Sequence, residues 1–419
     1  MITLEQRTLH TWCCLPRAIS INSNHLLLKT MKMLIKWMCI YSIFIIHISQ
    51  ITLGKQQSIL VFGGNGFMGA ETVERMLSQK DNYKVTMINR GNWYWDSDTR
   101  IKPFVHNIIC DRTQLLSECV PLQSLLSDGV YFDFVVDFSA YHPFQITNAL
   151  QIFQGMIGRY IYISSDSVYE VCEKNHDGYA LETDAVRPVD ETVRRELNAK
   201  DGYGNEKLGG EEELINGDVP YLILRLPDVI GPRDNTLRWW TYQLWMKLST
   251  HLTRQITIPI RLFSKPISFV YVKDVADLIE RSLTFKDEVF NQAYNLAFSE
   301  TWTLYQVLSK IGRSLEKYDI NIMLDERRDY FYLFPSVTLG PINIEKAKKY
   351  LDWKPTQLEI AAEETIRFYE DAINNKTFTK NANQVIENIK RYFTEDPNEV
   401  YRGLATEYGI TSYQNREDL

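Results

Sequence analysis

The sequence lacks a metal-binding pattern of cysteine or histidine, an excess of positive charge, and internal repeats. None of its six cysteines takes the Cys-x-x-Cys or Cys/His spacing of a zinc site. A formal net charge of −7 argues against a general nucleic-acid surface, although it leaves room for a local basic cleft. With 45% hydrophobic and 24% charged residues over 419 positions, the composition is that of a globular protein with a sizeable core.

Cysteine is scarce beyond the N-terminal segment, where only Cys110, Cys119 and Cys172 remain. These three cannot all pair within one chain. A Cys110–Cys119 disulfide is one interpretation. Buried or free thiols are the other, and the usual burial of cysteine side chains favours it.

An apolar segment lies near the N-terminus. Residues 31–54 combine a basic start, an apolar run over Met38–Ile48 and an exit with small residues, which predicts a secretory signal peptide. The run is short for a bilayer span of roughly 20 residues. Cleavage before Lys55 would leave no stable membrane span, and residues 1–30 would be an upstream extension. The alternative is an uncleaved signal anchor, because apolar residues continue to Leu53.

The chain ends in Arg416-Glu417-Asp418-Leu419, which is similar to the lumenal retention signal Lys-Asp-Glu-Leu with its two acids exchanged. Together with a signal peptide, this ending predicts the endoplasmic-reticulum lumen. Asn375-Lys376-Thr377 would be a glycosylation site in that compartment.

Apolar strand-like and helix-like segments alternate through the first half of the chain. Ser58–Phe62 is a short buried-type strand, Phe67–Leu77 has helical spacing, and Lys84–Ile88 is a second strand. Such alternation predicts an α/β fold, a Rossmann doubly wound parallel sheet. Further strands are expected at Phe104–Ile109, Phe132–Phe138, Arg159–Ser164 and Tyr221–Leu226.

The alternation fades after about residue 235, which suggests a division of the chain. We expect an α/β domain of the Rossmann type over residues 55–235. A smaller C-terminal lobe over 236–375 would interleave with it, and 376–419 would be a polar, loosely attached tail.

A glycine-rich loop follows the first strand. Gly63, Gly66 and Gly69 have the spacing GxxGxxG between a strand and a helix. Glycines at these positions permit a tight turn, close approach of the backbone to a pyrophosphate, and close helix packing. Phe67 and Met68 begin the helix, whose N–H groups and dipole would face the phosphates. The loop therefore predicts a dinucleotide site.

The second strand ends at Asn89-Arg90-Gly91. NAD-specific sites usually carry an acid there for the ribose hydroxyls. Asn89 replaces it, and Arg90 would suit a 2′-phosphate, so NADP is slightly favoured over NAD. Asp111, after the third strand, would accept a hydrogen bond from the adenine amine.

Tyr203 and Lys207 are four residues apart, which puts them on one face of a helix. An ammonium beside a phenol lowers the phenol pKa and makes tyrosine a usable general acid/base. Upstream, Ser165 ends a strand and would face the crevice where ligands bind. It would hold the substrate oxygen that Tyr203 protonates.

The chain resembles the extended short-chain dehydrogenase/reductase superfamily, which contains the NAD-dependent epimerases and dehydratases. The resemblance lies in the order of three motifs: the glycine loop, the serine at the end of a strand, and the YxxxK pattern. The resemblance spans roughly residues 57–372. Later segments also match it, namely Arg225–Asp234, Phe269–Ala276, Tyr294–Leu296 and Lys346–Pro355. It implies a Rossmann fold, bound NAD or NADP, and Ser165, Tyr203 and Lys207 as the catalytic set for hydride transfer on a small molecule. Family enzymes commonly form homodimers.

The chain departs from the family's pattern at several positions. Dehydratases carry Thr-Asp-Glu where this chain has Ser165-Asp166-Ser167, so elimination of water is disfavoured. Asp228 stands where sugar-nucleotide enzymes often have Asn, and its charge would repel a diphosphate. Asp166 and Asp228 are therefore candidate substrate contacts. An insert around Glu170–Glu196 brings the chain closer to atypical members, including the plastid stem-loop RNA-binding relatives.

Two classes of function follow. The first is an NAD(P)-dependent oxidoreductase or epimerase acting on a hydroxylated, sugar-like molecule. The second is a catalytically silent dinucleotide-binding sensor, or an RNA-binding protein related to the plastid proteins. The intact Tyr203/Lys207/Ser165 set favours the enzyme, and the net charge disfavours RNA.

Overall fold

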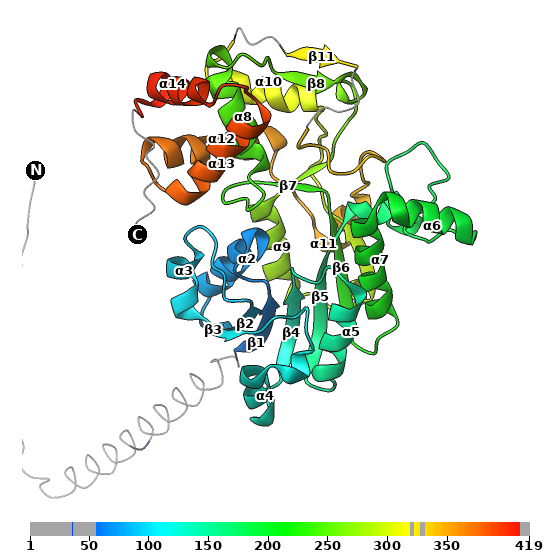
Figure 1. The fold of residues 1–419 in the computed structure, drawn as a ribbon. Coiled ribbons are helices and arrows are strands. Elements are labelled where there is room, and N and C mark those ends of the chain that lie inside the picture. Colours follow the sequence, from blue (N-terminus) through cyan, green and yellow to red (C-terminus); the bar gives the residue numbers. More distant parts are fainter. Residues whose placement is uncertain (1–35, 37–55, 319–321, 327–331, 411–419) are drawn as a thin grey trace, which may run out of the picture. The chain divides into compact units, whose positions relative to one another are not determined.

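Seven strands form one parallel sheet in the computed structural model of the chain, in the order β10-β6-β5-β4-β1-β2-β3 (Figure 1). This is the strand order of a doubly wound dinucleotide-binding fold with one strand added, so the predicted fold class is confirmed. The strands are β1 (Gln57–Phe62), β2 (Tyr83–Asn89), β3 (His106–Ile109), β4 (Phe132–Asp137), β5 (Ile157–Ser165), β6 (Tyr221–Leu226) and β10 (Gln292–Asn295).

The structure describes residues 36, 56–318, 322–326 and 332–410. The predicted signal segment 31–54, apart from residue 36, and the ending Arg416–Leu419 lie outside the described residues. From Gln56 onward the chain forms one compact unit. Across the described ranges, every helix is too short or too polar to traverse a bilayer.

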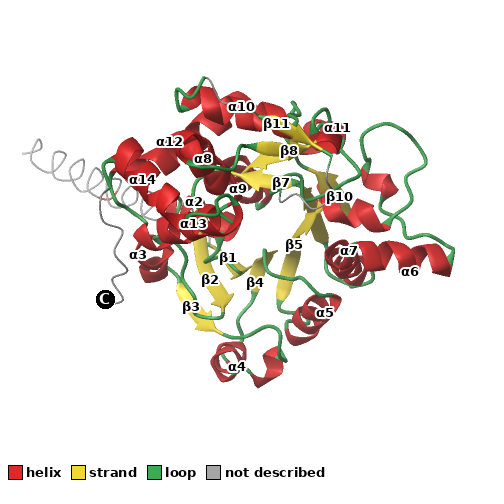
Figure 2. Ribbon diagram, turned by 45° about the horizontal axis from the view of Figure 1, so that its top comes forward, coloured by secondary structure: helices red, strands yellow, loops and turns green. Residues whose placement is uncertain are grey.

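Both faces of the sheet are covered by helices because successive side chains of each strand point to opposite faces. Leu60 shares a buried cluster with Ile146 of α5 on one face, and Val61 shares another with Val73 of α2 on the other. Figure 2 shows α4, α5 and α7 on one side of the sheet and α2 and α9 on the other. These helices are α2 (Phe67–Ser78), α4 (Val120–Ser127), α5 (Pro143–Ile152), α7 (Gly202–Ile215) and α9 (Val272–Ser282).

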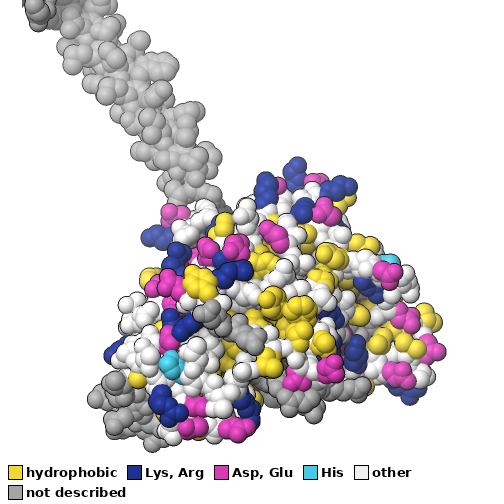
Figure 3. All heavy atoms as spheres, turned by 90° about the horizontal axis from the view of Figure 1, so that it is seen from above, with side chains coloured by type: hydrophobic (Ala, Val, Ile, Leu, Met, Phe, Trp, Pro, Cys, Tyr) yellow, Lys and Arg dark blue, Asp and Glu magenta, His cyan; other side chains and the backbone are white. Residues whose placement is uncertain are grey.

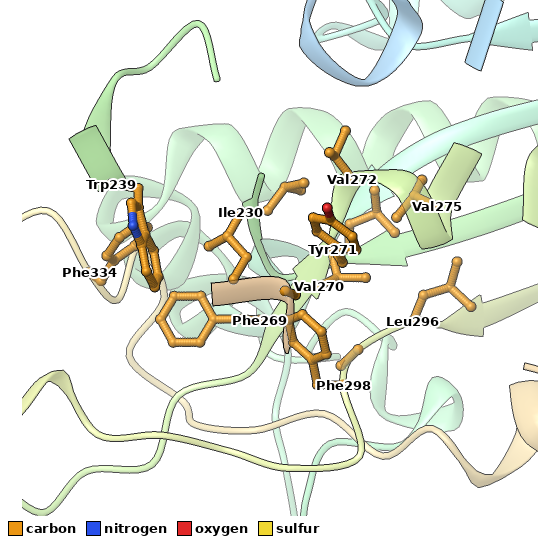
Figure 4. Packing of buried hydrophobic residues seen from close by; sticks show 14 of the residues in the cluster. Ile230, Trp239, Phe269, Val270, Tyr271, Val272, Val275, Leu296, Phe298 and Phe334 are labelled. Atoms are coloured by element: carbon orange, nitrogen blue, oxygen red, sulfur yellow. The ribbon is translucent and has the colours of Figure 1, made fainter. Parts of the chain in front are cut away.

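A second, smaller lobe is joined to the sheet through a two-stranded unit, β7 (Asp228–Ile230) with β9 (Phe269–Tyr271). Phe269 and Val270 lie among fully buried aromatic and aliphatic side chains, including Phe334 and Trp239 (Figure 4). The lobe also contains α8 (Arg238–Leu248), β8 (Thr257–Pro259), α10 (Leu304–Ser314), β11 (Met323–Asp325) and α12 (Leu358–Asn374). Shorter helices are α3 (Ser97–Arg100), α6 (Glu191–Lys200) and α11 (Glu345–Leu351).

The segment after residue 376 is helical and packed over 379–408, so the expectation of a loosely attached tail is wrong there. α13 (Thr379–Tyr392) and α14 (Pro397–Tyr408) both pack on α8. Phe393 stacks on Trp245 with 4.0 Å between ring centroids. Val385 and Leu404 are fully buried. Apolar residues at helical spacing within a polar segment explain the difference, because each helix buries one stripe.

Cys110 and Cys119 form a disulfide, so the favoured expectation of free thiols is wrong for this pair. Their Cα atoms lie 5.9 Å apart because the chain leaves β3 and turns back into α4. Cys172 is a buried free thiol. The face seen from above carries acidic and basic side chains interspersed around hydrophobic ones (Figure 3).

Candidate functional site

Two adjoining cavities lie at the carboxyl edge of the sheet, where the parallel strands end together. The first, of about 330 Å³, is lined by the ends of β1, β2 and β3. The second, of about 630 Å³, is lined by the end of β5, the start of α7, and β7. Phe67, Met68, Phe138 and Tyr141 line both. Ligands of open α/β sheets bind at this edge.

The glycine loop forms the floor of the smaller cavity. A Cβ on Gly69 would lie 2.3 Å from the carbonyl oxygen of Gly63, so α2 approaches the loop as only glycine allows. Gly63 has φ +76°, which favours glycine. Gly66 is the N-cap of α2 and offers no side chain there. The first N–H groups of the helix, those of Phe67 and Met68, have no intrahelical partner and suit an anion.

The residues predicted to contact the adenosine half of the dinucleotide line the same cavity. They differ in whether their polar groups are already engaged by neighbouring residues. Asn89 is buried, donates to Asn107, and accepts from the Gly91 N–H at 2.8 Å, so its amide holds the turn after β2. Arg90 is exposed at the cavity wall. One Asp111 oxygen accepts from the N–H and hydroxyl of Thr113, which lowers the pKa of that carboxyl.

Arg112 was not singled out from the sequence, although its neighbour Asp111 was. It is buried at the wall of the smaller cavity and pairs with Asp137 at the end of β4. It also donates to the Ser139 hydroxyl at 3.1 Å and the Gln145 carbonyl at 3.0 Å. Arg112 therefore shapes the strand ends around the site. The sequence did offer one sign of this role, because Arg112 directly follows Asp111, the predicted adenine contact.

The structure brings Ser165, Tyr203 and Lys207 together on the wall of the larger cavity. Ser165 ends β5, and Tyr203 and Lys207 lie one turn apart on α7. The Lys207 ammonium is buried and donates to the Ala140 and Ile163 carbonyls, both at 2.8 Å. It lies 6.0 Å from the centroid of the Tyr203 ring.

Gly204, between Tyr203 and Lys207, explains how α7 reaches the serine. A Cβ on Gly204 would lie 2.1 Å from the Ser167 carbonyl oxygen, so the helix touches the turn that follows β5. Asp201 caps the helix by accepting from the Gly204 N–H at 2.8 Å. The sequence showed this glycine, but its role depends on a contact between segments far apart in the chain.

The ionisation of the site differs from the expectation drawn from sequence. Tyr203 keeps 46% of its surface accessible, yet desolvation of its phenol by the surrounding protein raises the phenol pKa, and a hydrogen bond with Ser165 opposes that rise. Burial lowers the pKa of Lys207 to about 8. At neutral pH, Tyr203 carries its proton.

Three carboxyl groups line one corner of the larger cavity, Asp166, Glu170 and Asp228, here named the acid corner. Asp228 pairs with Arg238 and accepts from the Ser336 N–H at 2.9 Å. Its charge is thus compensated, which weakens the repulsion of a diphosphate expected from sequence. Arg238 follows Asp228 by 10 residues and Ser336 follows it by 108, and neither was singled out from the sequence.

The chain is similar in sequence to known proteins. Residues 139–297 match the model of the NAD dependent epimerase/dehydratase family. The low-salt glycan biosynthesis protein Agl12 of Haloferax volcanii is 25% identical over 287 residues, which cover 61% of this chain and 83% of that protein.

Solved structures share the fold. A dTDP-glucose 4,6-dehydratase from Bacillus anthracis in complex with NAD has a TM-score of 0.57 at 19% identity, covering 75% of this chain and 97% of that one. A UDP-glucuronic acid 4-epimerase from Bacillus cereus with UDP-glucuronic acid and NAD has a TM-score of 0.57 at 20% identity, with 75% and 99% covered.

Proposed function

We propose that the chain is an NAD(P)-dependent oxidoreductase or epimerase acting on a hydroxylated, sugar-like molecule. The match of residues 139–297 to the model of the NAD dependent epimerase/dehydratase family supports this proposal. The observation that carries the proposal is the meeting of Ser165, Tyr203 and Lys207 on one cavity that shares Phe67 and Met68 with the glycine-loop cavity. A dinucleotide lying across both cavities would reach the three catalytic candidates.

The residues at the smaller cavity fit a dinucleotide. The close Gly63–Gly69 contact leaves room for a pyrophosphate on the N-terminus of α2. Arg90 and Asp111 would face the adenosine half, and Lys207 the nicotinamide ribose. When bound, the dinucleotide supplies the hydride acceptor and donor.

In the catalytic step, the chain's own residues move one proton and hold one oxygen. The Tyr203 hydroxyl gives its proton to the substrate carbonyl oxygen in the direction of reduction and takes it back in oxidation. The Ser165 hydroxyl hydrogen-bonds the same oxygen. Because its pKa is raised, the Tyr203 hydroxyl is protonated before the reaction and can supply the proton that reduction needs. Ser167, which replaces the dehydratase carboxylate, provides no base for elimination.

The test of this proposal is a comparison of the full chain with its Tyr203→Phe variant. We expect NAD or NADP to bind both proteins alike, measured by titration of tryptophan fluorescence. Oxidation of polyols and sugars, followed by absorbance of the reduced dinucleotide, should fall by ~100-fold or more in the variant, the usual contribution of a general acid/base. Equal turnover would remove Tyr203 from the mechanism. Absence of dinucleotide binding to the wild type would remove the proposal.

We propose NADP as the preferred dinucleotide because Arg90 is an exposed cation on the wall of the smaller cavity. Arg90→Ala should weaken NADP binding by ~10-fold and NAD binding much less, since only NADP carries a 2′-phosphate for the guanidinium. Titration of both dinucleotides against wild type and variant measures this. Equal losses for NAD and NADP would contradict the preference.

We also propose that the protein works in the lumen of the endoplasmic reticulum. The Cys110–Cys119 disulfide supports an oxidising compartment. N-terminal sequencing of the protein from secretory membranes should find a mature chain that begins near Lys55. A mature chain that retains Trp37 would refute cleavage.

A further inference from the structure

A junction joins the two cavities, and six residues line both of them: Phe67, Met68, Phe138, Tyr141, Asp234 and Thr236. Among the aromatic rings of this set, that of Tyr141 is the most exposed, with 55% of the residue's surface accessible. A dinucleotide that reaches from the glycine loop to Lys207 must pass through this junction. Tyr141 is therefore placed to touch the middle of such a ligand.

The Tyr141 side chain lies between the two ends of the site. The Lys207 ammonium is 5.0 Å from the centroid of its ring. Desolvation by the surrounding protein raises the pKa of the Tyr141 phenol, and the charge of Asp137 raises it further. The phenol of Tyr94 acts in the same direction and Arg90 in the opposite one, so both lie within electrostatic reach of the hydroxyl. With a raised pKa, the hydroxyl keeps its proton at neutral pH and is a hydrogen-bond donor.

The backbone of Tyr141 is fixed, while its hydroxyl is not engaged. The Gln145 side chain accepts from the N–H of Tyr141 at 2.7 Å and from that of His142 at 3.1 Å, at the start of α5. Within the described part of the chain, the hydrogen bonds of Tyr141 come from its backbone, and its hydroxyl has no partner. A donor on a fixed turn at a cavity wall suits an acceptor on the ligand.

The position of Tyr141 indicates which part of the dinucleotide it would meet. Arg90 is assigned to the adenosine half and Lys207 to the nicotinamide ribose, and the diphosphate joins these halves. β4 borders β1, so the turn after β4 lies beside the glycine loop (Figure 2). A Cβ on Gly63 would lie 2.9 Å from the Cβ of Ser139, two residues before Tyr141. The turn that carries Tyr141 is thus in contact with the loop that would hold the diphosphate.

We propose that Tyr141 is a further dinucleotide-binding residue, which covers the diphosphate from the solvent side and donates its hydroxyl to a phosphate oxygen. This inference rests on the proposed function, because it adds a residue to the dinucleotide site of that proposal. The glycine loop and the first N–H groups of α2 bind the diphosphate from one side. The Tyr141 hydroxyl adds a donor from another segment, and its ring keeps water from the phosphates.

Tyr141→Phe tests the proposal, because it keeps the ring beside Lys207 and removes only the hydroxyl. The probes are ADP, which contains the diphosphate, and adenosine, which lacks it, each titrated into the full chain by calorimetry. We expect the variant to bind ADP ~10-fold more weakly, the effect of one hydrogen bond to a charged group, and adenosine with a change of ~2-fold or less. NADH contains the same diphosphate and should lose affinity by a similar factor.

Tyr131→Phe is the matched control. Tyr131 is 49% exposed and directly precedes β4, whereas Tyr141 follows the same strand at its other end. Because Tyr131 lines neither cavity, its variant should bind ADP as the wild type does. Unchanged ADP affinity in Tyr141→Phe would overturn the proposal. Equal losses for ADP and adenosine would also overturn it, since they would show that Tyr141 supports the cavity without binding the diphosphate.

The same titrations separate this inference from the proposed function. Binding of ADP and NADH to the wild type, with the same affinities in Tyr141→Phe, would defeat only the assignment of Tyr141. A wild type that binds neither ADP nor NADH would defeat the proposed function and this assignment together.

Discussion

At the residue scale, the chemistry of the site depends on burial more than on the spacing of residue types. The YxxxK pattern predicted that Lys207 lowers the pKa of Tyr203. In the fold, Lys207 is the more strongly buried of the two, and its ammonium donates hydrogen bonds to two backbone carbonyls. Spacing along a helix fixes which side chains share a face, but desolvation depends on everything packed around that face.

The lowered pKa of Lys207 predicts a particular dependence of stability on pH. Its folded pKa of about 8 lies below the ordinary value of 10.5, so folding disfavours its charged form. The penalty is complete below pH 8 and is relieved as the pH rises towards 10.5. Relative to Lys207→Met, the wild type should gain up to ~3 kcal/mol of unfolding free energy over that interval. Urea unfolding at several pH values measures it, and a constant difference between the proteins would contradict it.

At the element scale, the strand–loop–helix unit at residues 57–78 was the part most readily foreseen. β1 and α2 agree closely with the expected segments 58–62 and 67–77. The expected third strand, 104–109, is shorter because Lys102–Phe104 forms a turn of 3-10 helix that contains Pro103. Proline fixes φ and removes a backbone donor, which favours the turn over a strand.

Two glycines of the loop should respond differently to the same substitution. In Gly69→Ala, the added Cβ would meet the Gly63 carbonyl oxygen at 2.3 Å, so the free energy of unfolding should fall by ~2 kcal/mol or more. At Gly66 the nearest atom lies 3.5 Å away, so Gly66→Ala should cost about 1 kcal/mol or less. Both should weaken dinucleotide binding. Thermal and urea unfolding without ligand distinguish them, and equal destabilisation would contradict the packing described for α2.

At the scale of the whole molecule, the C-terminal helices are part of the core. α13 and α14 cover α8, whose residues are nearly all buried. α8 also supplies Arg238 to the acid corner, so the C-terminal helices pack on the helix that forms part of the wall of the larger cavity.

Phe393→Ala tests whether these helices belong to the core. The ring is 3% exposed and stacks on Trp245, so its loss should destabilise the protein by ~3–5 kcal/mol. Phe104→Ala, at a ring that is 66% exposed, is the control and should change stability by ~0.5 kcal/mol or less. Calorimetric unfolding compares them. Similar stability of Phe393→Ala and wild type would restore the loosely attached tail.

The sequence by itself determined the parallel sheet, the glycine loop after β1, and the order in which Ser165, Tyr203 and Lys207 occur. These follow from periodicity and local turn chemistry, which act between near neighbours in the chain. Only the tertiary structure decided the partners of the carboxyl groups, the ionisation of Lys207 and Tyr203, and the packing of the C-terminal helices. Those depend on side chains that come from distant segments. A charge pattern in one dimension does not reveal which charges are paired in the folded chain.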